Sequence, residues 1–178
     1  MSPITFTDAD FQGIDQEKDD LMVMTIEIKN FAVKKVLVDQ GSSVDIMYWV
    51  TYQKLQLPAE AMVHYDEPIY GFPRERLCTR EYIDLHTIFR KGNQSKTILV
   101  RFLVVEAHTS YNVLLGRPSL NTLGAIVSTP HLAVKFLSTS KDIITIHEDQ
   151  RLARECYIAG LRPKEPVLTN SNRRGTRP

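Results

Sequence analysis

Residues 36–43 of this 178-residue chain read Val36-Leu37-Val38-Asp39-Gln40-Gly41-Ser42-Ser43. The three apolar residues, two of them β-branched, predict the end of a buried strand. An aspartate follows the strand directly, and the glycine two residues later permits a sharp turn that a Cβ would resist. The pattern predicts a carboxylate on a rigid base at the mouth of a hydrophobic core. Asp and Gly are also ordinary turn residues, so a plain turn is the alternative for this stretch alone.

A second stretch lies far downstream and reads Tyr111-Asn112-Val113-Leu114-Leu115-Gly116-Arg117-Pro118. Together the two stretches resemble the retropepsin family of aspartic peptidases, the proteases of retroviruses and LTR retrotransposons. That family carries Asp-Thr/Ser-Gly-Ser/Thr after a buried strand, and later two hydrophobic residues and a glycine before a short helix. The sequence is most similar to the protease segment of plant gypsy-type retrotransposon polyproteins. The resemblance covers about residues 21–157 and includes Gly71-Phe72, residues 102–105 and residues 149–157.

The resemblance implies an all-β, retropepsin-like acid protease half-barrel with one or two short helices. It also implies that Asp39 is catalytic and that Gln40, Gly41 and Ser42 form the active-site loop around it. In that arrangement the hydroxyl of Ser42 hydrogen-bonds the outer oxygen of the Asp39 carboxylate. The activity implied is that of an aspartic endopeptidase that processes a retrotransposon polyprotein.

Two further elements follow from the same resemblance. Leu114, Leu115 and Gly116 correspond to the psi-loop that precedes the short helix. Gly71 and Phe72 correspond to the flap, a hairpin that closes over bound peptide and needs a flexible backbone. The related plant elements usually show a second glycine soon after the phenylalanine, whereas residues 74 and 75 are Arg and Glu here. An ordinary exposed hairpin is therefore the alternative for this segment.

The number of catalytic carboxylates predicts how such a site is assembled. Aspartic peptidases use two facing carboxylates that share one proton. The chain contains one Asp-x-Gly-Ser sequence, and no second copy occurs in its 178 residues. We therefore expect a homodimer in which two copies of Asp39 meet across a two-fold axis and act on a polypeptide substrate, the parent polyprotein. This chemistry needs no cofactor and no metal.

Gln40 stands where the family has Thr or Ser. That hydroxyl makes hydrogen bonds across the dimer axis beneath the two carboxylates, and a glutamine is longer and lacks it. Crowding at this position would cost roughly 1–3 kcal/mol. The alternative function is therefore a catalytically silent retropepsin-like module that serves as a dimerisation or spacer element of the polyprotein.

Apolar patterning predicts many short strands, which indicates a closed or sandwich-like all-β domain. Residues 44–55 carry apolar residues at three- and four-residue spacing and predict a short helix, in which Asp45 is expected near the helix start or facing solvent. The aromatic residues 48, 49 and 52 are expected to pack a small core. The predicted strands cover residues 21–29, 32–38, two segments within 62–90 around a turn at 71–73, then 97–105, 111–115, 125–128, 131–136 and 143–147, with a turn at 91–96 and a helix at 119–123.

Composition narrows the remaining possibilities. Residues 1–20 read as an acidic linker, residues 21–157 as the peptidase-like domain and residues 158–178 as a disordered basic tail. A net charge of +1 argues against a nucleic-acid binder beyond weak contacts of the tail. The two cysteines form no CxxC pair, and no signal peptide or membrane span is evident, so an intracellular, cytoplasmic location is expected. The His147–Arg151 segment begins like a zinc motif but lacks its second histidine.

Overall fold

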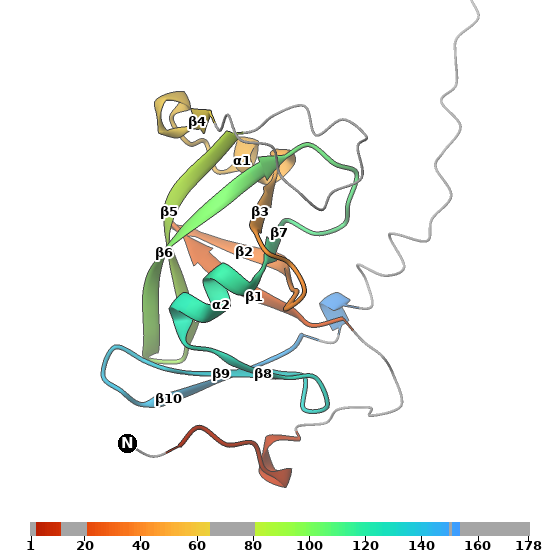
Figure 1. The fold of residues 1–178 in the computed structure, drawn as a ribbon, viewed down its shortest axis with the longest axis vertical. Helices are drawn as coiled ribbons and strands as arrows, with labels where there is room; N and C mark the ends of the chain where they lie inside the picture. Colours follow the sequence, from red (N-terminus) through yellow and green to blue (C-terminus); the bar gives the residue numbers. More distant parts are fainter. Residues whose placement is uncertain (1–2, 12–20, 65–80, 150, 154–178) are drawn as a thin grey trace, which may run out of the picture.

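The computed structural model describes residues 3–11, 21–64, 81–149 and 151–153. Seven strands within these residues form one mixed sheet in the order β1-β2-β7-β3-β6-β5-β4. Because β1 also pairs with β5, the first six of these strands close into a barrel, which Figure 1 shows above a smaller sheet. The strands are β1 (Val23–Ile28), β2 (Phe31–Val38), β3 (Asp45–Tyr48), β4 (Val63–His64), β5 (Glu81–Lys91), β6 (Gln94–Val105) and β7 (Val113–Leu115).

The position of β7 defines the topology of the barrel. This strand lies between β2 and β3, parallel to β2 and antiparallel to β3. It therefore joins two segments that precede it by many residues in the chain. The predicted β1–β2 hairpin, the strand before Asp39 and the strand before Gly116 are all confirmed.

Strands β5 and β6 form a long antiparallel hairpin paired from Glu81 with Val104 to Lys91 with Gln94. The turn between them is tighter than predicted, because both strands run into the segment 91–96 and leave only two residues between them. Gly92 adopts a φ of 59° there, a left-handed conformation that suits glycine. The turn predicted at residues 71–73 lies outside the described residues.

The predicted helix over residues 44–55 is wrong in its first half. Residues 45–48 form strand β3, and only the following residues form the helix α1 (Trp49–Lys54). Strand β3 pairs with β6 on one side and β7 on the other, and its first three residues are buried. A strand whose two faces are both covered shows no polar alternation, so its apolar residues can be mistaken for a helical period.

A second sheet packs beside the barrel. It contains β8 (Ile126–Ser128), β9 (Ala133–Leu137) and β10 (Ile143–His147), and the helix α2 (Arg117–Leu123) connects it to β7. Pro118 lies in the first turn of α2, and Gly124 ends the helix with a φ of 67°. The three predicted strands and the short helix are therefore confirmed, as is the all-β class with few short helices.

One hydrophobic core extends from the barrel to the second sheet. Its fully buried aromatic residues include Phe89, Phe102 and Phe136, and Phe89 packs edge-on against Phe136 with ring centroids 6.0 Å apart. Tyr52 is buried and Trp49 stacks on it at 5.2 Å, so this part of the predicted aromatic packing is confirmed. No helix in the described part of the chain is long and apolar enough to cross a membrane.

The segment before the barrel also has contacts in the structure. Residues 3–11 run along the second sheet and include a 3₁₀ turn, η1 (Asp8–Asp10) (Figure 1). The residues of this segment show no helical or strand periodicity, so the sequence did not predict these contacts. The division of the chain into linker, domain and tail stays a prediction, and the tail from residue 158 lies outside the described residues.

Candidate active site

Asp39 lies directly after strand β2, at the position that the sequence predicts. Its backbone N–H donates a 2.9 Å hydrogen bond to the carbonyl oxygen of Leu115 on β7. Its carboxylate oxygen Oδ1 accepts a 2.9 Å hydrogen bond from the backbone N–H of Gly41. The carboxylate is half-buried. The strand β7 and the turn thus fix both the backbone and the side chain of this residue.

A β-bulge in β2 sets the direction in which Asp39 leaves the strand. The pairing with β1 shifts between Met24 and Ile26, and Lys35 adopts a φ of 58°. The bulge lets Val33 and Val36 both face the core although they are three residues apart. Such an extra residue reverses the alternation of a strand, and bulges are common next to functional sites for this reason.

Asn112 holds this bulge in place. Its side-chain amide donates a 2.7 Å hydrogen bond to the Lys34 carbonyl, and its backbone N–H donates a 2.9 Å bond to the Lys35 carbonyl. Its Oδ1 accepts a 3.3 Å bond from the hydroxyl of Thr51 on α1. One side chain therefore connects β2 to the helix that follows β3. No pattern in the sequence predicts this role of Asn112.

The Asp39 loop and the residues after β7 form a second set of contacts. The backbone N–H of Arg117 donates a 2.9 Å hydrogen bond to the Ser42 carbonyl. At Gly116, a Cβ atom would lie 2.3 Å from the carbonyl oxygen of Val44 and 2.8 Å from that of Ser42. Real Cβ atoms do not approach backbone atoms so closely, and only glycine fits. The two stretches quoted from the sequence are thus in direct backbone contact.

Two details of the loop differ from the expectations. The Ser42 hydroxyl does not bond the Asp39 carboxylate: it donates to the Val44 carbonyl at 2.7 Å and accepts from the Val44 N–H at 3.3 Å. A serine hydroxyl reaches the backbone two residues on with little cost, and this local bond prevails here. Gly41 does not adopt a positive φ. Its lack of a Cβ matters instead because that atom would lie 3.2 Å from Asp39 Oδ1.

Asp45 lies elsewhere than the sequence predicted. Its side chain is only 3% exposed, at the start of β3 rather than near a helix start or in solvent. Its Oδ1 accepts a 2.7 Å hydrogen bond from the backbone N–H of Gly116. Burial raises the pKa of Asp45 above its ordinary value, while the hydroxyl of nearby Ser119 and the backbone N–H groups of Gly116 and Ser119 oppose the rise. The Ser119 hydroxyl is itself buried beside this carboxyl group.

A small apolar cluster lies on the face of β3, β6 and β7 opposite the main core. Its buried members are Ile46, Leu103 and Val105, and the half-buried Leu114 and Tyr48 pack against them. Burial and the neighbouring charge of Asp39 both raise the pKa of the Tyr48 hydroxyl, which places this phenol within electrostatic reach of the Asp39 carboxylate. The cluster therefore extends from the Asp39 loop as an apolar wall.

The remaining predicted residues are placed as follows. Gln40 is exposed in the turn after Asp39. Leu115 and Gly116 are buried, and the sequence-predicted psi-loop residues all contact or adjoin the Asp39 loop. The predicted flap residues Gly71 and Phe72 lie outside the described residues. Within the described ranges, no three His, Cys, Asp or Glu side chains gather in a way that could hold a metal ion.

Comparisons with known proteins identify the fold. No family model matches the sequence, and no curated protein sequence matches it. The retroviral protease-like domain of Ddi1 from Leishmania major superposes with a TM-score of 0.54 at 17% identity, covering 74% of this chain and 98% of that one. The EIAV protease in complex with the inhibitor HBY-793 aligns with a TM-score of 0.42 at 19% identity, covering 62% and 94%. The chain therefore has a retroviral protease-like fold, and the predicted fold class is confirmed.

Proposed function

We propose that the chain is one half of a homodimeric aspartic endopeptidase and that Asp39 is its catalytic residue. The observation that carries the proposal is the construction of the Asp39 loop. The loop follows a buried strand, is hydrogen-bonded to Leu115 and Arg117, and presents one half-buried carboxylate. A carboxylate held this firmly by backbone groups is suited to general acid–base chemistry.

Two such carboxylates make a complete site. With one Asp-x-Gly-Ser sequence per chain, the second Asp39 comes from a second copy across a two-fold axis. Two carboxylates held a few ångströms apart cannot both ionise cheaply, so the pair shares one proton. The charged member takes a proton from the attacking water, and the protonated member polarises the carbonyl of the scissile peptide bond.

The apolar wall beside the loop supports a polypeptide substrate. The half-buried Leu114 and Tyr48, packed on the buried Ile46 and Leu103, are the apolar side chains next to the Asp39 loop against which the residues flanking a scissile bond would bind. Gly71 and Phe72 are proposed as the flap over that substrate. The order of the sequence motifs, which resembles that of retrotransposon proteases, supports a retrotransposon polyprotein as the natural substrate.

A silent dimerisation or spacer module of the same polyprotein is the second candidate, and Gln40 is the observation that favours it. The side chain is exposed in the single chain, in the turn that would face the two-fold axis. A long amide at that position would crowd its own symmetry copy, whereas Thr or Ser would form a hydrogen bond there.

The experiment is a cleavage assay with a polyprotein-junction peptide at about pH 4–6, the range that suits a shared-proton dyad. We expect cleavage that a transition-state-analogue inhibitor of aspartic peptidases blocks. Asp39→Asn should abolish cleavage without unfolding the chain, since the amide is nearly isosteric with the carboxylate. Asp142→Asn, the same change in the exposed turn between β9 and β10, is the matched control and should retain activity. Equal cleavage by Asp39→Asn would exclude the mechanism, and no cleavage by the unaltered dimer would favour the silent module.

A further inference from the structure

The second sheet carries a buried cation that the proposed peptidase site does not use. Lys135 lies on β9 between Val134 and Phe136, which face the core, so its side chain lies on the opposite face. Its side chain is only 10% exposed. Among the described residues, the hydrogen-bond and ion-pair partners of its ammonium are Thr5 and Asp10, both within residues 3–11. A buried lysine needs such partners, because an unpaired charge in this position would be costly.

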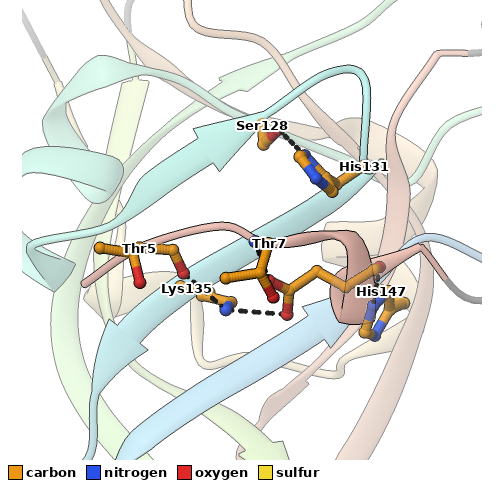
Figure 2. Close-up of polar contacts among 7 residues, drawn as sticks. Thr5, Thr7, Ser128, His131, Lys135 and His147 are labelled. Carbon is orange, nitrogen blue, oxygen red and sulfur yellow. Dashed lines mark hydrogen bonds and ion pairs between the residues drawn. The ribbon is translucent and has the colours of Figure 1, made fainter.

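The contacts between the segment 3–11 and the sheet are specific. The Lys135 ammonium lies 2.8 Å from Asp10 Oδ1 and donates a 2.8 Å hydrogen bond to the carbonyl oxygen of Thr5 (Figure 2). It also lies 4.9 Å from the centre of the Phe6 ring. Asp10 is 14% exposed, and its other carboxylate oxygen accepts a 2.7 Å bond from the backbone N–H of Thr7. The hydrogen bond from Lys135, aided by that from Thr7, holds the pKa of Asp10 below its ordinary value.

Two histidines complete the binding face. His131 stacks on Phe11 with ring centroids 4.0 Å apart and on Phe6 at 5.2 Å, and its Nδ1 lies 2.6 Å from the Ser128 hydroxyl. The Nε2 of His147 on β10 lies 2.9 Å from the carbonyl oxygen of Asp10, so it must donate there. Figure 2 shows these side chains from β9, β10 and the β8–β9 turn gathered on one side of the sheet. The face thus offers an ammonium for a carboxylate, an aromatic ring for two phenyl rings and donors for backbone carbonyls.

We propose that this face of β8–β10 is a second peptide-binding site, that its occupant is residues 3–11 of the same chain, and that the Asp10–Lys135 pair is its main determinant of recognition. The site fits a short segment that ends in a 3₁₀ turn, with an aspartate in that turn, an aromatic residue directly after the aspartate and a second aromatic residue four positions before it. The contacts between this segment and the sheet join parts of the chain that are far apart in sequence, as in the bond between Lys135 and Thr5, which are 130 positions apart. The segment is therefore a docked arm that can be exchanged for an equivalent peptide.

The test uses the full chain with a disabled arm. The variant Asp10→Ala/Phe11→Ala removes the carboxylate and one ring from the arm and leaves β8–β10 unchanged. A fluorescently labelled peptide of residues 3–11 is titrated with this variant and followed by anisotropy. We expect saturable binding that weakens about tenfold or more when the peptide carries Asp10→Asn. A peptide with Asp8→Asn, the same charge change at an exposed position, is the control and should bind like the unchanged peptide.

Adding Lys135→Met to the disabled-arm chain should also abolish the preference for the Asp10 peptide. No binding to the disabled-arm chain, or equal binding of the Asp10→Asn and Asp8→Asn peptides, overturns the proposal. Hydrogen exchange on the unaltered chain gives a measurement independent of any variant's folding. We expect the amides of Thr7, Asp10 and Phe11 to be protected equally at low and high protein concentration. Absent protection overturns the docked arm, and protection that grows with concentration places the arm on a second copy instead.

Discussion

The buried carboxylate of Asp45 accepts a 2.7 Å hydrogen bond from the backbone N–H of Gly116, which is 71 positions away in the chain. Asp45 begins β3, and Gly116 follows β7, so the bond joins the two strands where both reach the Asp39 loop. The adjacent bond from Arg117 to the Ser42 carbonyl lies in the same region. Asp45 therefore links the start of β3 to the residue after β7 beside the loop.

Two replacements of Asp45 should distinguish the contribution of its hydrogen bond to stability from that of its ionisable carboxyl group. Asp45→Asn keeps an acceptor oxygen for the Gly116 N–H, whereas Asp45→Leu leaves that buried donor unsatisfied. We expect Asp45→Leu to lower the free energy of unfolding by about 1–3 kcal/mol more than Asp45→Asn does. Urea denaturation of both variants measures the difference, and equal stability would show that the hydrogen bond contributes nothing.

The stability of the unaltered chain relative to Asp45→Asn should also depend on pH. Burial raises the pKa of Asp45, so the folded chain binds the proton more tightly than the unfolded chain. This contribution is complete below the ordinary value of 3.8 and is lost as the pH rises through the raised value. Because asparagine does not titrate, the unaltered chain should lose stability relative to Asp45→Asn over the pH range that begins at the ordinary value of 3.8 and extends upward through the raised pKa. A constant difference across that range would contradict the raised pKa.

Two glycine substitutions should affect different properties. Gly116→Ala places a Cβ against the backbone carbonyl oxygens of Val44 and Ser42, which cannot move without displacing the loop. We expect a loss of about 3 kcal/mol or more in the free energy of unfolding. Gly41→Ala meets only the Asp39 carboxylate, at 3.2 Å, and should cost less stability but displace that carboxylate. Thermal unfolding together with the cleavage assay checks both, and a larger stability loss for Gly41→Ala would contradict this account.

Asn112 should contribute more to the free energy of unfolding than an exposed asparagine does. Asn112→Ala removes the bond to the Lys34 carbonyl at the β2 bulge and the bond to Thr51, so we expect a loss of about 1–3 kcal/mol. Asn121→Ala, on the exposed side of α2, is the matched control and should change stability far less. Urea denaturation of both variants measures the effect. Similar values would mean that the bulge holds its shape without the side chain.

The sequence predicted those parts of the fold that have a local signal. The strand before Asp39, the turn after it and the helix after Gly116 each have distinctive residues, and the structure confirms all three. Strand β3 has no such signal, because it is covered on both faces and its residues do not alternate. The burial of Asp45 was missed for the same reason. A residue at the start of a surface helix faces solvent, whereas Asp45 lies inside the sheet.

The contacts of the arm and of Asn112 could not be predicted for a different reason. Lys135 contacts Asp10 and Thr5, which lie more than a hundred residues away in the sequence. Neither segment has a sequence pattern that predicts its contact with the other. Asn112 acts through the bulge at Lys35, whose positive φ falls on a lysine and is not a sequence signal. Long-range polar pairs of this kind depend on the register of the sheets and appear only in three dimensions.

Gln40 is exposed beside Asp39 in the single chain. In the proposed dimer this position faces its symmetry copy, so Thr would replace two crowded amides by hydroxyls that can bond across the axis. We expect Gln40→Thr to tighten the dimer by about 1–3 kcal/mol, roughly ten- to hundredfold in the dissociation constant, and to raise the rate of cleavage. Gln53→Thr, the same change on the exposed side of α1, is the control and should leave the dimer unchanged. Sedimentation at several concentrations measures the dissociation constant, and a weaker Gln40→Thr dimer would show that residue 40 does not lie at the two-fold axis.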